Sequence, residues 1–116
     1  MTYAKYGNRK TEVDGITFDS KAESQRYQEL KLLQVEGEVS GLSTQPSFTL
    51  QPAFNRDGKR VREIVYRADF MYFEGNKMVV EDVKGGRGTQ TAAFKLKRKM
   101  FLYHYPEYEL RIVDHA

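Results

Sequence analysis

The sequence has no cysteine, so disulfides, thiolate metal sites and cysteine nucleophiles are all excluded. No apolar run approaches the length of a bilayer span, and the segment 1–10 lacks the apolar stretch that a secretory signal requires. We therefore expect a cytoplasmic protein without a membrane partner. Segment 1–10 is polar and contains glycine, which predicts a flexible arm.

Other catalytic devices are missing as well. The chain has two histidines, both distant in sequence from the acidic residues discussed below, which disfavours a histidine metal site. The run Gly85-Gly86-Arg87-Gly88 lacks the pattern of a phosphate-binding loop, and no serine lies in a nucleophile elbow. We expect no small-molecule cofactor, and we interpret the glycine run as a plain loop or as a place where a DNA backbone comes close.

Length and composition are typical of one globular domain. The chain has 116 residues, 40% hydrophobic and 30% charged, enough for one modest core. Its net charge of +3 is a weak sign of an anionic partner. The cations cluster in segments 56–67 and 95–99, with aromatic residues nearby, which is typical of nucleic-acid surfaces and equally of ordinary solvated surface.

The pattern of apolar and turn-forming residues predicts an α/β fold. Asp14-Gly15 between β-branched residues indicates a tight hairpin, and Ser20 followed by Glu23 matches the capping box that opens a helix. Asp57-Gly58 marks a turn between two predicted strands. The expected elements are a hairpin over 11–18, a helix over 20–36, strands over 42–52, 61–73 and 77–84, a helix over 90–104 and a strand over 107–114.

Three polar residues stand where a core strand should be apolar. Asp69 interrupts the strand 61–73, and Asp82 and Lys84 close the strand 77–84. Because side chains alternate along a strand, Asp82 and Lys84 point the same way. A short turn makes the two strands antiparallel neighbours, which brings Asp69 level with Asp82.

Two adjacent carboxylates repel each other, and burial strengthens the repulsion. A hard divalent cation resolves the conflict, since Mg²⁺ takes oxygen ligands and keeps waters for a substrate or nucleophile. Lys84 beside the pair would position the attacking water or stabilise charge on a phosphate. The alternative is an ordinary cross-strand salt bridge between Lys84 and one of the aspartates.

Glu23 is a third candidate carboxylate. It shares a face of the first predicted helix with Tyr27 and Leu30, the face expected to pack on the sheet, so it points toward the core. It is also the third residue of the capping box, and one side chain hardly serves both a cap and a metal ion. Both roles stay open.

The second predicted helix carries cations and an apolar stripe. Lys95 and Lys97 are the preferred phosphate contacts, with a solvated helix face as the alternative. The stripe expected to pack on the sheet consists of Ala93, Leu96, Met100 and Tyr103.

These residues resemble a known superfamily. Asp69 followed by Asp82-Val83-Lys84 resembles the Asp…(Asp/Glu)-x-Lys signature of the PD-(D/E)XK nucleases, whose common core is a helix, a three-stranded meander, a helix and a strand. Ala68 stands in place of the named proline, which is often missing. Over nearly its whole length the chain also resembles a family of small bacteriophage and prophage nuclease-like proteins in that superfamily. The segments that carry this likeness are 5–8, 13–23, 66–70 and 80–85.

The resemblance implies a restriction-endonuclease-like core of order αβββαβ, with a central mixed sheet flanked by two helices and an N-terminal hairpin in front. It implies that Asp69, Asp82 and the Val83 carbonyl bind Mg²⁺ or Mn²⁺. It further implies that Lys84 assists the water nucleophile and that Glu23, a candidate catalytic residue and metal ligand, matches the acidic residue many members carry on the first helix. The cations expected to contact nucleic acid are Arg67, Arg87, Lys95 and Lys97.

The sequence thus predicts a metal-dependent phage-type DNA endonuclease in a bacterial host cell. Branched DNA or recombination and replication intermediates are attractive substrates, because small members of the superfamily often act as homodimers that cut two strands. Two other functions stay open. One is a non-catalytic DNA-binding module of the same fold; the other is a phage structural or partner-binding protein whose acids and lysine form a salt-bridge network.

Overall fold

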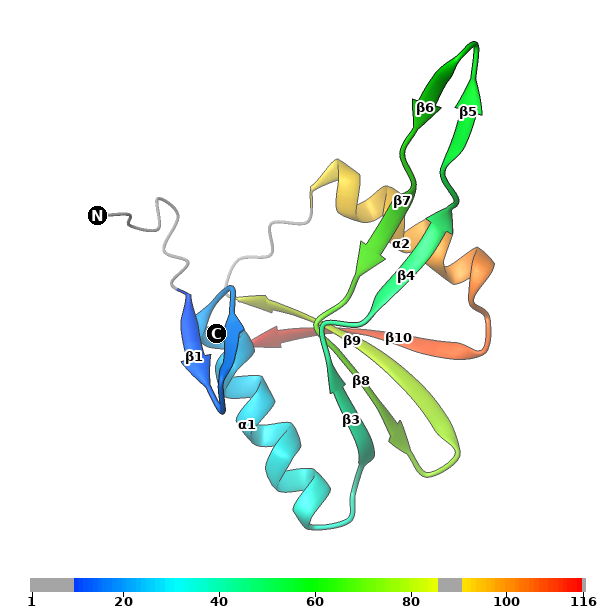
Figure 1. The fold of residues 1–116 in the computed structure, drawn as a ribbon. Helices are drawn as coiled ribbons and strands as arrows, with labels where there is room; N and C mark the ends of the chain where they lie inside the picture. Colours follow the sequence, from blue (N-terminus) through cyan, green and yellow to red (C-terminus); the bar gives the residue numbers. More distant parts are fainter. Residues whose placement is uncertain (1–9, 86–90, 116) are drawn as a thin grey trace, which may run out of the picture.

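The computed structural model describes residues 10–85 and 91–115, which form ten strands and two helices (Figure 1). The predicted arm over 1–10 lies outside these ranges except for Lys10. Neither helix in the described ranges has the length and apolar character needed to cross a membrane. The elements are β1 (Thr11–Val13), β2 (Ile16–Phe18), α1 (Lys21–Val35), β3 (Ser40–Thr44), β4 (Ser47–Gln51), β5 (Phe54–Arg56), β6 (Lys59–Val61), β7 (Ile64–Arg67), β8 (Phe70–Glu74), β9 (Lys77–Gly85), α2 (Ala92–His104) and β10 (Tyr108–His115).

The first hairpin and the first helix follow from their turn and cap residues. Asp14 and Gly15 both have positive φ, 55° and 77°, as a two-residue turn between β1 and β2 requires. The Oγ of Ser20 accepts a hydrogen bond from the backbone N–H of Glu23 at 3.1 Å, which caps α1. Gly37, with a φ of 82°, follows the end of the helix, where a left-handed residue is favoured.

The central sheet is mixed. Its strand order is β10-β9-β8-β3, with β10 parallel to β9 and the remaining neighbours antiparallel. The structure therefore confirms the coarse prediction of an α/β fold with a mixed sheet, two helices and a leading hairpin.

Two hydrophobic clusters lie on opposite faces of this sheet. Alternation along β9 divides its side chains between them, because Val79 and Val83 belong to one cluster and Val80 to the other. The first cluster contains the fully buried Leu30 of α1, and the second contains the fully buried Phe101 of α2. Each helix thus covers its own face of the sheet (Figure 1).

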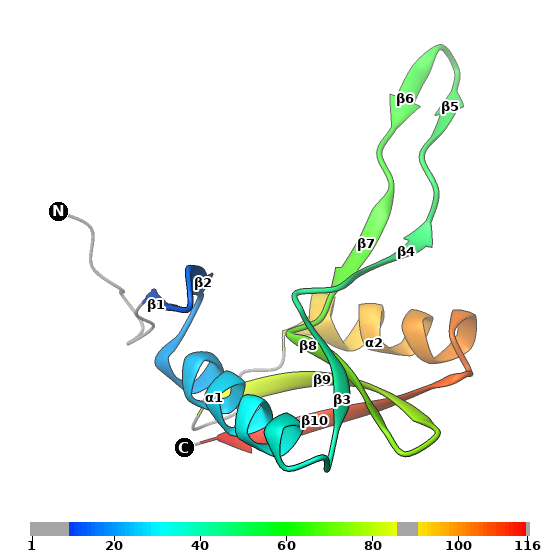
Figure 2. The same ribbon diagram turned by 60° about the horizontal axis from the view of Figure 1, so that its bottom comes forward.

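The predictions of continuous strands over 42–52 and 61–73 are wrong. The first segment divides into β3 and β4, and the second into the end of β6, then β7 and β8. Because β4 pairs with β7 and β5 with β6, these segments leave the sheet and form a two-stranded projection (Figures 1 and 2). We call residues 53–63, which hold β5, β6 and the turn between them, the β-arm.

The stripe predicted to pack α2 on the sheet is only partly right. Met100 packs against the second cluster as expected. Leu96 and Tyr103 are 59% and 81% exposed, whereas Phe101 is buried and Phe94 packs against the same cluster. The helix is rotated from the expected phase because two aromatic rings bury more apolar surface than the predicted stripe offers. This rotation brings Lys97, three residues after Phe94, to the side of the helix that faces the sheet.

Candidate functional site

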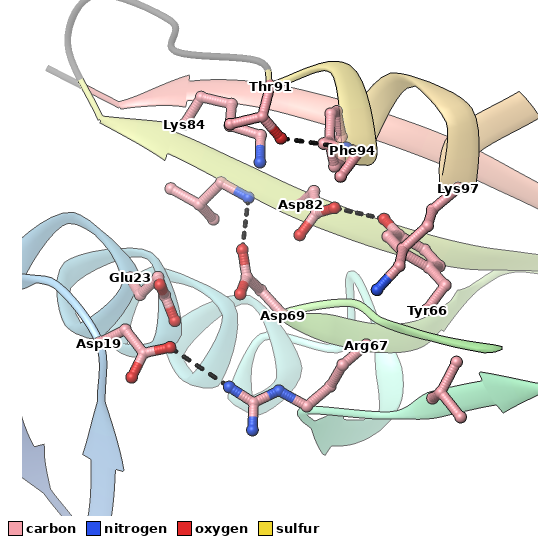
Figure 3. A pocket seen from close by; sticks show the side chains of 13 residues that line it. Asp19, Glu23, Tyr66, Arg67, Asp69, Asp82, Lys84, Thr91, Phe94 and Lys97 are labelled. Atoms are coloured by element: carbon pink, nitrogen blue, oxygen red, sulfur yellow. Dashed lines mark hydrogen bonds and ion pairs between the residues drawn. The ribbon is translucent and has the colours of Figure 1, made fainter. Parts of the chain in front are cut away.

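One cleft, with a volume of about 390 Å³, gathers most of the residues predicted to carry chemistry (Figure 3). It opens between the first turn of α1, the junction of β7 and β8, the end of β9 and the start of α2. Figure 3 shows the carboxylates of Glu23, Asp69 and Asp82 around one space. The cleft is lined by Asp19, Glu23, Val65, Tyr66, Arg67, Asp69, Asp82, Val83, Lys84, Thr91, Ala93, Phe94 and Lys97.

Asp69 lies at the junction between β7 and β8, not inside a strand as the sequence predicted. Its backbone N–H donates to the Glu81 carbonyl at 3.1 Å, and its Oδ2 accepts from the backbone N–H of Val83 at 2.7 Å. These bonds place it level with Asp82, as the hairpin predicted. Burial, followed by the charge of Glu23, raises the pKa of Asp69 from 3.8 to about 9.

Asp82 is 5% exposed on β9, and its Oδ2 accepts a hydrogen bond from the hydroxyl of Tyr66. Burial and then the charge of Asp82 raise the pKa of Tyr66, so the phenol keeps its proton and continues to donate. Asp82 and Lys84 line the cleft, while the adjacent Glu81 faces Arg26 of α1. The predicted alternation of these side chains is therefore confirmed.

Glu23 reaches the cleft from the first turn of α1. Its backbone N–H serves the helix cap by donating to Ser20, while its side chain lines the cleft beside Asp69. Burial and the charge of Asp19 raise the pKa of Glu23. The cap and the cleft use different atoms of this residue, so the two roles considered from the sequence do not compete.

Lys84 places its ammonium on the wall of the cleft. Its Nζ lies 3.8 Å from the centre of the Phe94 ring, a cation–π contact that favours this position. The cross-strand salt bridge considered from the sequence is not formed, since no ion pair in the described ranges joins Lys84 to Asp69 or Asp82. The positive charge can therefore face a ligand.

The cations predicted to contact nucleic acid are not all at the cleft. Arg67 and Lys97 line it, whereas Lys95 is exposed on α2 outside the lining. Arg67 forms an ion pair with Asp19 at 3.2 Å, and because both side chains are about half exposed the pair is weak. Arg87 and the loop around it lie outside the described residues.

The donor set of the cleft fits a hard cation only in part. No group of three or more His, Cys, Asp or Glu side chains in the described ranges is arranged to hold a metal ion. One oxygen of Asp69 and one of Asp82 accept hydrogen bonds from Val83 and Tyr66, which leaves a second oxygen on each carboxylate. Mg²⁺ is usually bound through one or two carboxylates together with waters and substrate phosphates, so Asp69 and Asp82 are the residues of the cleft that could hold it.

Six residues that line the cleft were not predicted as site residues: Asp19, Val65, Tyr66, Thr91, Ala93 and Phe94. Thr91 had a usable signal, because threonine is a favoured helix cap; its Oγ1 accepts from the backbone N–H of Phe94 at 3.0 Å. No sequence signal indicated the contact between Tyr66 and Asp82, because this contact depends on how β7 bends away from the sheet.

Comparison with known proteins identifies a family for this chain but no function. No curated protein matches the chain. One family profile, described as "Protein of unknown function (DUF1064)", matches residues 3–116, nearly the whole sequence. The chain therefore belongs to the DUF1064 family.

Proposed function

We propose that this protein is a metal-dependent nuclease that hydrolyses phosphodiester bonds in DNA. The observation that carries the proposal is the convergence of Glu23, Asp69 and Asp82 in one cleft, beside an ammonium group on Lys84. Buried carboxylates with raised proton affinity weaken a fold unless a cation joins them. Their clustering is therefore better explained by a ligand than by stability.

The order of elements supports the same function. Without the segments that leave the sheet, the chain runs α1, β3, β8, β9, α2 and β10, with β3, β8 and β9 as an antiparallel meander and β10 parallel to β9. This order agrees with the helix, three-stranded meander, helix and strand of the PD-(D/E)XK core. We accordingly assign the restriction-endonuclease-like fold as part of the proposal.

In this mechanism Asp69 and Asp82 hold Mg²⁺ or Mn²⁺, with the Val83 carbonyl and Glu23 as further candidates. The bound cation supplies positive charge to the phosphate and makes water a better nucleophile at neutral pH. Tyr66 orients Asp82 through its hydrogen bond, since groups that hold a metal ligand in place also tune it.

The cations of the cleft act on the substrate. Lys84 sits on the same face of β9 as Asp82, where its ammonium stabilises negative charge as it develops on the phosphate oxygens or positions the attacking water. Arg67 and Lys97 line other parts of the cleft and bind phosphates of the flanking backbone. The Asp19 ion pair of Arg67 is exposed enough to exchange for a phosphate.

The test is cleavage of a labelled DNA panel containing single-stranded, duplex, flap and four-way junction substrates. Each is incubated with Mg²⁺, Mn²⁺ or EDTA. The parent protein is compared with Asp82→Asn and Lys84→Met. Lys77→Met serves as a control that removes one exposed cation at the opposite end of β9 from Lys84.

Metal-dependent cutting that disappears in Asp82→Asn and Lys84→Met, and persists in Lys77→Met, supports the proposal. Binding without cutting under any metal would instead favour a non-catalytic DNA-binding module. A protein that neither cuts nor binds DNA would favour the structural or partner-binding alternative.

A further inference from the structure

The β-arm lies outside the core of the protein. Every residue of β5 and β6 is exposed, and the two strands pair only with each other. Figures 1 and 2 show the β-arm extending away from both helices and from the central sheet. A two-stranded hairpin contributes little to the stability of a fold that it does not touch, so its role lies in an interaction.

The β-arm is nevertheless a defined structure. Asp57 and Gly58 at its tip have φ values of 53° and 74°, the conformations of a tight hairpin turn. The β-arm continues from β4 and β7, and at the other end of these two strands the chain bends twice. There the Gln45 N–H donates to the Asp69 carbonyl at 2.8 Å and the Ala68 N–H to the Pro46 carbonyl at 3.0 Å. These bonds hold the end of the β4–β7 pair that adjoins Asp69 and the cleft.

The charge of the β-arm is strongly one-sided, with four cations against two carboxylates. Within the described part of the chain Lys59, Arg60 and Arg62 form no ion pair. Ion pairs do engage several cations on the body of the protein, among them Arg26, Lys31, Lys77 and Arg111. The charged residues of the β-arm are Arg56, Asp57, Lys59, Arg60, Arg62 and Glu63.

Further cations without an ion pair lie close to the base of the β-arm. α2 packs against β4 and β7, the strands from which the β-arm extends. In the described ranges none of the four cations in the middle of α2 forms an ion pair. These cations are Lys95, Lys97, Arg98 and Lys99. Positive charge without an acidic partner therefore lies on both the β-arm and α2, and α2 also forms part of the cleft wall.

The two faces of the β-arm differ in chemistry. The register pairs Phe54 with Val61 and Arg56 with Lys59, and alternation puts these four side chains on one face. Asn55 and Arg60 form the pair on the other face. Arginine and asparagine are the side chains that bind guanine and adenine edges, and a two-stranded β-ribbon fits the major groove of DNA.

We propose that the β-arm binds duplex DNA by lying in a groove, where its cations contact the phosphates of both strands. A duplex held in this way extends from the β-arm toward the cleft. The link to the cleft rests on the proposed nuclease function, whereas binding of the duplex by the β-arm does not. A two-stranded ribbon with cations on both faces suits a groove bounded by two backbones better than a single strand.

The test compares two variants that each remove three positive charges. The β-arm variant is Lys59→Gln/Arg60→Gln/Arg62→Gln, and the matched control is Lys21→Gln/Lys31→Gln/Lys77→Gln on the body of the protein. Binding of a labelled duplex and of its labelled single strand is measured by fluorescence anisotropy over a series of salt concentrations. EDTA is present throughout, so that cleavage plays no part.

We expect the β-arm variant to bind the duplex at least about tenfold more weakly than the parent. The magnitude of the slope of log affinity against log salt should also fall by about 2 to 3, because each lost phosphate contact lowers that magnitude by about 0.9. The control should stay close to the parent. Equal losses in both variants, or an equal loss for the single strand, would overturn the proposal.

A shortened protein, with residues 54–61 replaced by Asn-Gly, provides a second test. It should unfold at nearly the parent's temperature and lose duplex binding as the charge variant does. If the shortened protein kept the parent's affinity for duplex, the proposal would be overturned. If it also changed from a dimer to a monomer, the β-arm would be assigned to self-association instead. The protein could bind duplex through the β-arm and yet never cut DNA. That result would contradict the nuclease proposal and leave the proposal for the β-arm intact.

Discussion

Arg26 of α1 and Glu81 of β9 form a two-pronged ion pair on the face of β9 opposite Asp82. The Arg26 Nε lies 2.7 Å from Glu81 Oε2, and its Nη2 lies 3.0 Å from Oε1. Glu81 is completely buried and also accepts a hydrogen bond from the hydroxyl of Tyr72 at 2.6 Å. Because Arg26 is one turn from Glu23 and Glu81 adjoins Asp82, the pair fixes the two elements that carry these acids.

Loss of this ion pair should destabilise the fold. Glu81→Gln leaves the Arg26 guanidinium without its charged partner, and we expect the free energy of unfolding to fall by about 3 kcal/mol. Urea denaturation followed by circular dichroism measures the change. Glu29→Gln is the control, because Glu29 is an exposed partner of the same arginine and such pairs contribute less than about 1 kcal/mol. Equal effects of the two substitutions would contradict the assignment.

The stability of the protein should depend on pH and metal through Asp69. Its pKa is raised from 3.8 to about 9, so between these values the unfolded chain has lost a proton that the folded chain keeps. The contribution of Asp69 to stability is therefore full below pH 3.8 and is lost as the pH rises toward about 9. A divalent cation favours the ionised carboxylate, so Mg²⁺ should stabilise the protein more at about pH 8 than at about pH 5.

Thermal unfolding with and without Mg²⁺ at the two pH values measures this effect. Asp69→Asn removes the titrating group, and the variant should be less sensitive to metal at the higher pH. Glu107→Gln, an exposed position away from the cleft, is the control and should behave as the parent does. A metal response of the same size in Asp69→Asn would show that the cation binds elsewhere.

The central pattern of the cleft was predictable because it follows from local rules. Alternation along one strand placed Asp82 and Lys84 on the same face, and the short turn before Lys77 placed Asp69 level with Asp82. The helix cap at Ser20 positioned Glu23 in the first turn of α1. None of these inferences needed the distant contacts of the fold.

The turn at the tip of the β-arm was predicted from Asp57-Gly58, but the departure of this segment from the sheet was not, for an equally physical reason. Apolar and polar residues continue to alternate through a bend, so the period of the sequence does not reveal where a strand leaves its sheet. Gln45, at the bend between β3 and β4, has a φ of 53°, a conformation uncommon for residues other than glycine. The hydrogen bond from its N–H to the Asp69 carbonyl joins residues far apart in sequence, and no local signal marks it.

The hydroxyl of Tyr66 should matter for metal binding more than for folding. Tyr66→Phe keeps the ring, which packs 5.3 Å from Phe101 between ring centres, and removes the donor to Asp82. We expect the affinity for Mn²⁺ to fall about 10- to 100-fold, as when a residue that supports a metal ligand is lost. Isothermal titration calorimetry measures the affinity. Tyr105→Phe removes a hydroxyl that donates to the Thr49 carbonyl outside the cleft, and it should leave the affinity unchanged.

The two functions of the α1 terminus should separate by mutation. Ser20→Ala removes the oxygen that accepts from the Glu23 N–H, and the loss of a helix cap costs about 1 kcal/mol of stability. Glu23→Gln keeps that backbone bond but removes a charge from the cleft, so it should reduce metal-dependent cleavage about tenfold or more with little change in stability. Cleavage assays and urea denaturation of both variants provide the comparison. If Glu23→Gln lowered stability as much as Ser20→Ala and left cleavage intact, the side chain would belong to the cap, and the metal site would consist of Asp69 and Asp82 alone.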